Sequence, residues 1–156
     1  MNKRVQEEKA KMKTGKEIIG GPLFINGRQL TLSKAVRAGD FIFLTGQVPM
    51  KDGAPMTDGS IQEQTRAVLN DITETLATAD CRREDVVKAM VWLRNRADFP
   101  GFNEIYAEYF PIEPPTRSAI VSDLLVDARV EVEVMAYRPL GDLSLIHISE
   151  PTRPST

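Results

Sequence analysis

The sequence is poor in the side chains that most often carry covalent or metal chemistry. Its 156 residues include one cysteine, Cys81, and one histidine, His147. A single cysteine cannot form an intramolecular disulfide, which suits a reducing compartment, and we interpret Cys81 as an inert thiol. With no histidine in residues 1–142, a Ser-His-Asp or Cys-His triad and a histidine-ligated zinc site are excluded there.

Long apolar runs and nucleotide-binding loops are also missing. The longest apolar stretches are a few residues long, as in FIFL at 41–44, whereas a bilayer span needs about 20 residues. No apolar stretch of signal-peptide length follows the N-terminal lysines. Neither GxGxxG nor the GxxxxGKS or GxxxxGKT loop occurs. We therefore expect a cytoplasmic protein that contacts no membrane and holds no metal.

Charge is distributed unevenly along a chain whose formal net charge is −2. Residues 1–17 carry a net charge of +3, whereas residues 18–142 hold 13 basic and 18 acidic side chains. An acidic body is a poor match for nucleic-acid phosphates, because that affinity depends on a surplus of Lys and Arg. We therefore expect no nucleic-acid partner.

The length is typical of one domain, with a distinct segment at each end. Residues 1–22 read as a charged, flexible leader that ends at a Gly-Gly-Pro break, and residues 23–142 as a single domain. Residues 143–156 contain LSLIHISEPTR, which resembles the translated read-through of a sequencing adapter. We predict that this tail is not native. Because His147 lies in it, function is argued without histidine.

Hydrophobic periodicity predicts strands and helices in the order ββαβαββ. The expected elements cover residues 31–36, 41–45, 60–79, 86–93, 98–110, 118–122 and 129–137. Residues 37–40 are expected to form the turn between the first two strands. Ser60 and Glu63 form a capping-box pattern, and Asp98 is expected to cap the second helix. This order predicts an α+β fold with two helices on one face of a single mixed sheet.

The last predicted strand indicates how the other sheet face is used. Its sequence RVEVEVMAY alternates, so valines occupy one face and Glu131 and Glu133 the other. With both helices on one side, nothing in the predicted domain covers the glutamate face. A large bare sheet face usually contacts a partner, and we expect a homo-oligomer that packs there.

Arg117 and Glu131 are the best candidates for chemistry. Arg117 opens a strand after Pro-Pro-Thr, and we expect Glu131 on the neighbouring strand of the same hairpin. An arginine can bind a substrate carboxylate through two parallel hydrogen bonds, and a nearby glutamate can orient or deprotonate a water. The alternative is an ordinary cross-strand ion pair on a solvated face.

Three further positions are weaker candidates. Thr45 and Gly46 end a predicted strand, where a glycine lets a ligand approach the backbone. The alternative for Gly46 is a plain turn glycine. Asn103 lies near the start of the second helix, where a surface polar residue is the alternative.

Taken together, these residues resemble the RidA/YjgF family of reactive-intermediate deaminases. The matching strings lie within residues 31–138 and are LSKAVRAGDFIFLTGQVP, IQEQTRAVLNDITETL, DVVKAMVWLRNRADFPGFNEIYAEYF, PPTRSAIV and VEVEVMA. The resemblance implies a chorismate-mutase-like fold and a homotrimer with ligand clefts at the subunit interfaces. It also implies a hydrolase that converts 2-imino acids to 2-keto acids and ammonia without a cofactor.

The resemblance assigns roles to individual residues of this chain. Arg117 would hold the carboxylate of a 2-imino or enamine acid, and Glu131 would position the hydrolytic water. Thr45, Gly46 and Asn103 would line the cleft for that small-molecule substrate.

Two departures from the family pattern leave other functions open. Leu32 stands where the family has a tyrosine, and Ala119, in the substrate-binding strand, stands where many deaminases have a cysteine. One alternative is therefore a trimer that binds a small carboxylic acid without turnover. A ribonuclease or chaperone-like activity, attached to some relatives, is the third.

Overall fold

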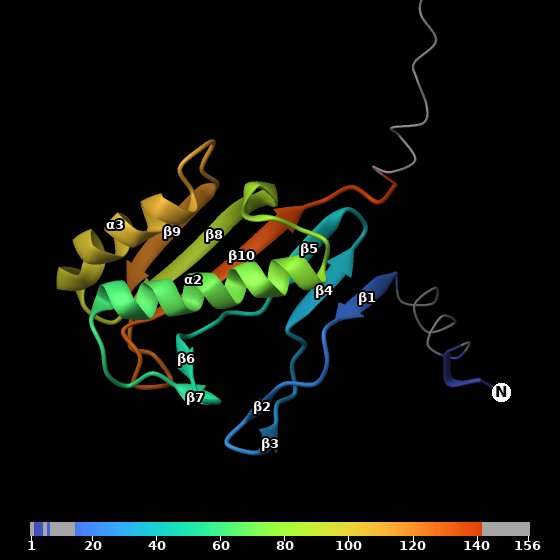
Figure 1. Ribbon diagram of the computed structural model, residues 1–156, viewed down its shortest axis with the longest axis horizontal. Coiled ribbons are helices and arrows are strands. Elements are labelled where there is room, and N and C mark those ends of the chain that lie inside the picture. The colour runs from blue at the N-terminus through green and yellow to red at the C-terminus, as the bar shows by residue number, and fades with distance from the viewer. Residues whose placement is uncertain (1, 5, 7–14, 142–156) are drawn as a thin grey trace, which may run out of the picture.

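The computed structural model describes residues 2–4, 6 and 15–141 (Figure 1). The predicted tail at 143–156, including His147, lies outside the described residues, as do residues 1, 5 and 7–14 of the N-terminal segment. Within the described part the main sheet has six strands in the order β1-β4-β5-β10-β8-β9. Their bounds are β1 Lys16–Ile19, β4 Ala35–Ala38, β5 Phe41–Leu44, β8 Val86–Leu93, β9 Thr116–Val121 and β10 Val130–Tyr137.

Two helices and two small ribbons accompany the main sheet. Helices α2 (Ile61–Thr78) and α3 (Phe99–Tyr109) lie on the same face of the sheet (Figure 1). The 3-10 turns η1 (Arg83–Asp85) and η2 (Arg96–Asp98) flank β8. The ribbons pair β2 (Phe24–Ile25) with β3 (Arg28–Gln29) and β6 (Met50–Lys51) with β7 (Ala54–Pro55). No described helix is long and apolar enough to cross a bilayer.

The sheet is mixed, which confirms the predicted α+β class. Strands β8 and β9 are parallel, and every other neighbouring pair of the main sheet is antiparallel. The core lies between the helices and the central strands, where Leu69 and Ile72 of α2 and Val132 of β10 are almost completely buried. The alternation along β10 puts Glu131 and exposed Glu133 on the other face, as the sequence predicts.

The two predicted helix caps have different outcomes. The capping box of α2 is confirmed, because the backbone N–H of Glu63 donates to Ser60 Oγ at 3.1 Å and the Ser60 N–H donates to Glu63 Oε2 at 3.0 Å. Asp98 occupies the N-cap position of α3, as predicted, but its side chain makes no capping hydrogen bond. Asp98 has helical backbone angles because η2 runs directly into α3, and its carboxylate instead accepts hydrogen bonds from Arg129 Nη1 at 3.1 and 3.2 Å.

The predicted pairing of the last two strands is also wrong. Strand β9 pairs with β8 at the sheet edge, and β10 lies between β5 and β8. The connection β8–α3–β9 joins neighbouring parallel strands, so β9 takes the outer edge. The central position goes to β10, whose Val130, Val132 and Val134 are buried beneath the helices.

The first hairpin differs from its prediction in register. Strand β4 begins at Ala35 rather than at residue 31, and a two-residue turn, Gly39-Asp40, joins it to β5. Gly39 has φ +59°, the left-handed conformation that such a turn needs at its first position. Strand β1 pairs with β4, so the sheet extends into residues 16–19 of the segment that the sequence assigns to a leader.

Candidate functional site

A β-bulge at the end of β5 is the starting point of the site. Phe43 pairs with Met135, and Gln47 pairs with Val132 through two backbone hydrogen bonds of 2.9 Å. Residues 44–46 therefore lie opposite only residues 133 and 134, which leaves one extra residue on the β5 side. Bulges commonly occur beside functional sites because they redirect the chain.

Gly46, within this bulge, lies directly against the side chain of Glu131. A Cβ atom at Gly46 would be 3.2 Å from Glu131 Oε2 and 3.4 Å from its Cδ. A larger residue would therefore push on the carboxylate, and glycine is needed for this close approach rather than for a turn conformation. The bulge and the glycine together bring the backbone that follows β5 close to the carboxylate.

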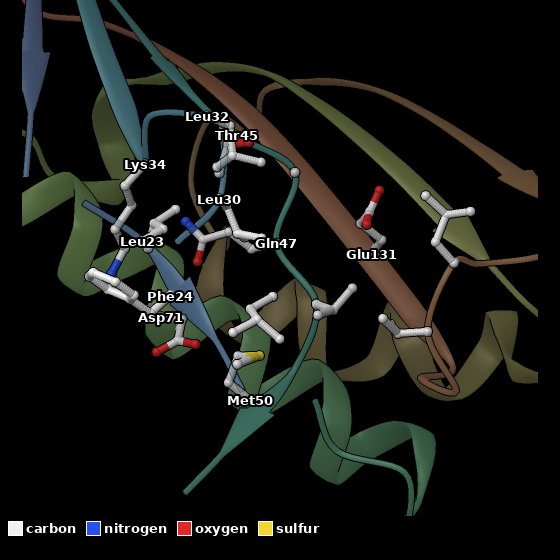
Figure 2. Close-up of a pocket in the computed structure, with 15 residues that line it drawn as sticks. Leu23, Phe24, Leu30, Leu32, Lys34, Thr45, Gln47, Met50, Asp71 and Glu131 are labelled. Carbon is white, nitrogen blue, oxygen red and sulfur yellow. The ribbon is translucent and has the colours of Figure 1, made fainter. Parts of the chain in front are cut away.

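A pocket of about 330 Å³ opens at the same place (Figure 2). Thr45, Gly46 and Glu131 line it, so three of the predicted site residues come together here. Leu32, the departure from the family pattern, lines it as well. Much of the remaining wall is apolar and comes from residues 23–25, 30, 48, 50, 125 and 126.

Burial sets the electrostatics of the pocket. The pKa of Glu131 is raised, first because burial disfavours the charged carboxylate and second because Glu133 carries like charge. Among the residues that the structure describes, none donates a hydrogen bond to Glu131. At the opposite end of the pocket, burial raises the pKa of Asp71 against the attraction of Lys34. Figure 2 shows Glu131 on one side and both Lys34 and Asp71 on the other.

Arg117 occupies a second location, beneath α3. Its Nη1 donates to Asn103 Oδ1 at 2.8 Å. Its guanidinium carbon lies 4.7 Å from the ring centre of Tyr106, 5.6 Å from that of Phe99 and 5.7 Å from that of Phe102. These rings and the amide surround the guanidinium, and its Nε and Nη2 have no hydrogen-bond acceptor within the described residues.

Two neighbours complete this second location. The hydroxyl of Tyr106 is buried and has no hydrogen-bond partner among the described residues, and burial raises its pKa while Arg117 opposes the rise. Ala119, two residues after Arg117 on the same strand face, lines a hollow of about 480 Å³ together with Phe99. Arg117, Asn103 and Ala119 are thus grouped together, apart from the pocket that contains Glu131.

Arg117 and Glu131 are not brought together within one chain, which corrects their predicted proximity. In the register of the sheet Arg117 pairs with Ala89, which is buried under the helices, whereas Glu131 pairs with Trp92 on the uncovered face. The two side chains therefore project from opposite faces of strands that β8 separates. A small ligand cannot contact both in a single chain.

Some residues that line the pocket are not among the predicted site residues. Residues 23–25 fall within the predicted domain but in no predicted element, although Asn26-Gly27 is a strong signal for a two-residue hairpin turn. Both residues have positive φ, 51° and 74°. No sequence pattern indicates Lys34 or Asp71, because only the fold brings the residue before β4 and helix α2 to one pocket.

Metal and thiol chemistry receive no support in the described part. No group of three or more His, Cys, Asp or Glu side chains with metal-binding geometry occurs among the described residues. Cys81 is buried, and burial raises the pKa of its thiol, as expected for a structural rather than a reactive cysteine.

Comparison with known proteins places this geometry in a family. Residues 29–138 match the family model described as Endoribonuclease L-PSP. The chain is 42% identical over 109 residues to a RutC family protein of Pyrococcus horikoshii, covering 68% of this chain and 86% of the relative. It is 32% identical over 103 residues to a protein of Dermatophagoides farinae named 2-iminobutanoate/2-iminopropanoate deaminase, covering 65% and 80%.

A solved structure supports the fold independently. The crystal structure of yeast Mmf1 superimposes with a TM-score of 0.71 at 28% sequence identity, covering 79% of this chain and 98% of that chain. The yeast protein is named as mitochondrial.

Proposed function

The chain belongs to the endoribonuclease L-PSP family, which includes the RidA/YjgF proteins, and from this we propose that it hydrolyses reactive 2-imino acids to 2-keto acids and ammonia. The observation that carries the proposal is the partly buried carboxylate of Glu131, set against Gly46 in a pocket of about 330 Å³. The name of the Dermatophagoides relative supports the same substrate class.

Glu131 supplies the proton transfers of the proposed reaction. Its carboxylate accepts a proton from a water as the water oxygen bonds to C2 of the imine. The protonated Glu131 returns this proton to nitrogen, which gives a neutral tetrahedral intermediate with one hydroxyl and one amino group on C2. Glu131 then accepts the hydroxyl proton of the intermediate and passes it to the amino nitrogen. The C2–N bond breaks, ammonia leaves, and the C2=O bond of the keto acid forms. Water and the imine are consumed, and a 2-keto acid and ammonia are formed. A carboxyl with a raised pKa suits these proton transfers near neutral pH.

Arg117 is proposed to fix the substrate carboxylate. The Nε and Nη2 donors not used for Asn103 can form two parallel hydrogen bonds to it. Holding the carboxylate orients C2 toward the water, and orientation alone supplies a large part of many rate enhancements.

The proposed site requires more than one copy of the chain. Because Arg117 and Glu131 project from opposite faces of the sheet, they can meet only if Arg117 of one subunit faces Glu131 of another. This supports the expected homotrimer with a cleft at each subunit interface. The cytoplasmic location stays a prediction, since the yeast relative is named as mitochondrial.

The test is imine hydrolysis by the full chain. An amino-acid oxidase generates 2-iminobutanoate in place, semicarbazide traps it, and the protein competes with the trap. We expect Arg117→Ala to lower kcat/KM at least about 100-fold, because it removes a charged partner of the substrate carboxylate. Arg66→Ala is the control, since Arg66 forms an exposed ion pair with Glu108 at 2.7 Å. Retained activity in Arg117→Ala would refute the carboxylate clamp.

A non-catalytic binder is the second candidate. Leu32 lines the pocket in place of the family's tyrosine, and Ala119 replaces a cysteine near Arg117. If the wild type fails to compete with semicarbazide, calorimetry with 2-oxobutanoate separates the remaining possibilities. Binding that Arg117→Ala abolishes would indicate a metabolite sensor. RNA binding at low salt would instead favour the ribonuclease alternative, which the acidic body disfavours.

A further inference from the structure

The β2–β3 hairpin forms one wall of the Glu131 pocket. Leu23, Phe24 and Ile25 line the pocket from the approach to the hairpin and from its first strand. These residues precede residue 29, where the match to the family model begins. This wall is therefore a feature of this chain beyond the matched region, and Figure 2 shows Phe24 beside Lys34 and Asp71 at the end of the pocket away from Glu131.

Several large apolar side chains around this pocket remain in solvent. Phe24 is 53% exposed, Leu32 45% and Leu125, in the loop before β10, is fully exposed. All three line the same pocket. Exposed apolar side chains that converge on one concave site indicate an apolar ligand group, because each loses contact with water when the site is filled.

The size and charge of the pocket further restrict the class of ligand that fits it. A volume of about 330 Å³ lies within the range of sites that bind small molecules, and a three-carbon imino acid offers only one methyl group to its apolar wall. Lys34 and Asp71 carry opposite charges beside Phe24, so this end of the pocket has no net preference for an anion or a cation.

We infer that the wall formed by Leu23, Phe24 and Ile25 selects 2-imino acids with large apolar side chains, such as those derived from leucine or phenylalanine. This inference rests on the proposed function. The reacting C2 lies at Glu131, and the substrate side chain extends along the apolar wall toward Phe24. The hairpin thus determines specificity and takes no part in the proton transfers.

Competition with semicarbazide tests the inference on imines made from L-alanine, L-leucine and L-phenylalanine. We expect kcat/KM for the leucine-derived imine to exceed that for the alanine-derived imine at least about 10-fold, mainly through KM, since three more carbons are buried. Phe24→Ala should remove most of this preference, because it should lower kcat/KM for the leucine-derived imine far more than for the alanine-derived imine. Arg28→Ala is the matched control, because Arg28 is exposed on the same hairpin and does not line the pocket.

The possible outcomes separate this inference from the proposed function. Equal rates with all three imines, or a Phe24→Ala variant that slows all of them equally, would overturn the specificity assignment and leave the deaminase function standing. If no imine is hydrolysed, calorimetry compares pyruvate with 4-methyl-2-oxopentanoate. Tighter binding of the larger keto acid, lost in Phe24→Ala, would support the pocket assignment while the function fails. Equal binding would overturn the assignment as well.

Discussion

Glu131 must be ionised to accept a proton, yet its surroundings oppose ionisation. Burial and the nearby charge of Glu133 raise its pKa above the usual carboxyl range. The folded chain therefore retains this proton at pH values where the unfolded chain has lost it. The free energy of unfolding therefore falls as pH rises from the ordinary carboxyl pKa to the raised one. Glu131 thus destabilises the folded chain at neutral pH.

The same shift predicts a pH dependence of activity. Glu133→Gln removes one cause of the raised pKa, so the acidic limb of the kcat/KM profile should move to lower pH while the rate at its plateau stays similar. The profile is measured with 2-iminobutanoate between pH 4 and 8, a range about the carboxyl pKa. Glu84→Gln is the control, an equal charge change at η1, at the far end of β8. An acidic limb that stays in place in Glu133→Gln would show that another group controls it.

Helix α2 depends on the reciprocal cap at its first turn. Ser60→Ala removes the acceptor of the Glu63 N–H and should lower the free energy of unfolding by about 1 kcal/mol. Imine hydrolysis should be unchanged, because neither residue lines the Glu131 pocket. Urea unfolding followed by circular dichroism measures the loss.

That measurement requires fixed protein concentration, because association shifts the apparent stability of an oligomer. Ser33→Ala is the matched control, the same chemical change outside any helix cap. A loss in Ser33→Ala equal to that in Ser60→Ala would argue that the cap contributes nothing specific.

Elements that are specified by neighbouring residues in the sequence could be predicted from the sequence. The capping box, the periodicity of α2 and the alternation of β10 each depend on residues within one turn or one strand. The predicted strand at residues 86–93 has the same bounds as β8. Propensity and burial act within these segments, so the sequence alone is sufficient to identify them.

Elements that depend on distant partners could not be predicted in this way. Strand β1 has four residues, and only its pairing with β4 makes it a strand. The position of β10 between β5 and β8 likewise depends on the whole sheet, and it separates Arg117 from Glu131. The candidate residues were therefore identified by type and motif, whereas their arrangement required the register of three strands.

At the scale of the whole molecule, the uncovered face of the sheet is suited to association. Phe41, Phe43 and Tyr137 are 39%, 45% and 44% exposed there, and the rings of Phe41 and Tyr137 lie 5.2 Å apart. Burying such side chains against a second copy removes apolar surface from water. We propose that the uncovered face of one chain packs near the edge strand β9 of the next, so that Glu131 of one chain lies near Arg117 of another.

Mixing two inactive variants tests whether each site is shared between chains. Arg117→Ala and Glu131→Gln should each abolish imine hydrolysis as pure proteins. In a cyclic trimer that contains both variants, one of the three interfaces pairs an intact Arg117 with an intact Glu131, so about one third of wild-type activity should return. The variants are co-expressed with different affinity tags and purified through both.

The control and the mass of the complex make this result decisive. Co-expression of Arg117→Ala with the double variant Arg117→Ala/Glu131→Gln provides no intact pair and should remain inactive. Light scattering should give three times the chain mass of 17.4 kDa. If the mixed trimers stay inactive, then either Arg117 and Glu131 act within the same chain or one of them takes no part in the reaction. A monomer with full activity would contradict the shared site, because the two side chains lie on opposite faces of its sheet.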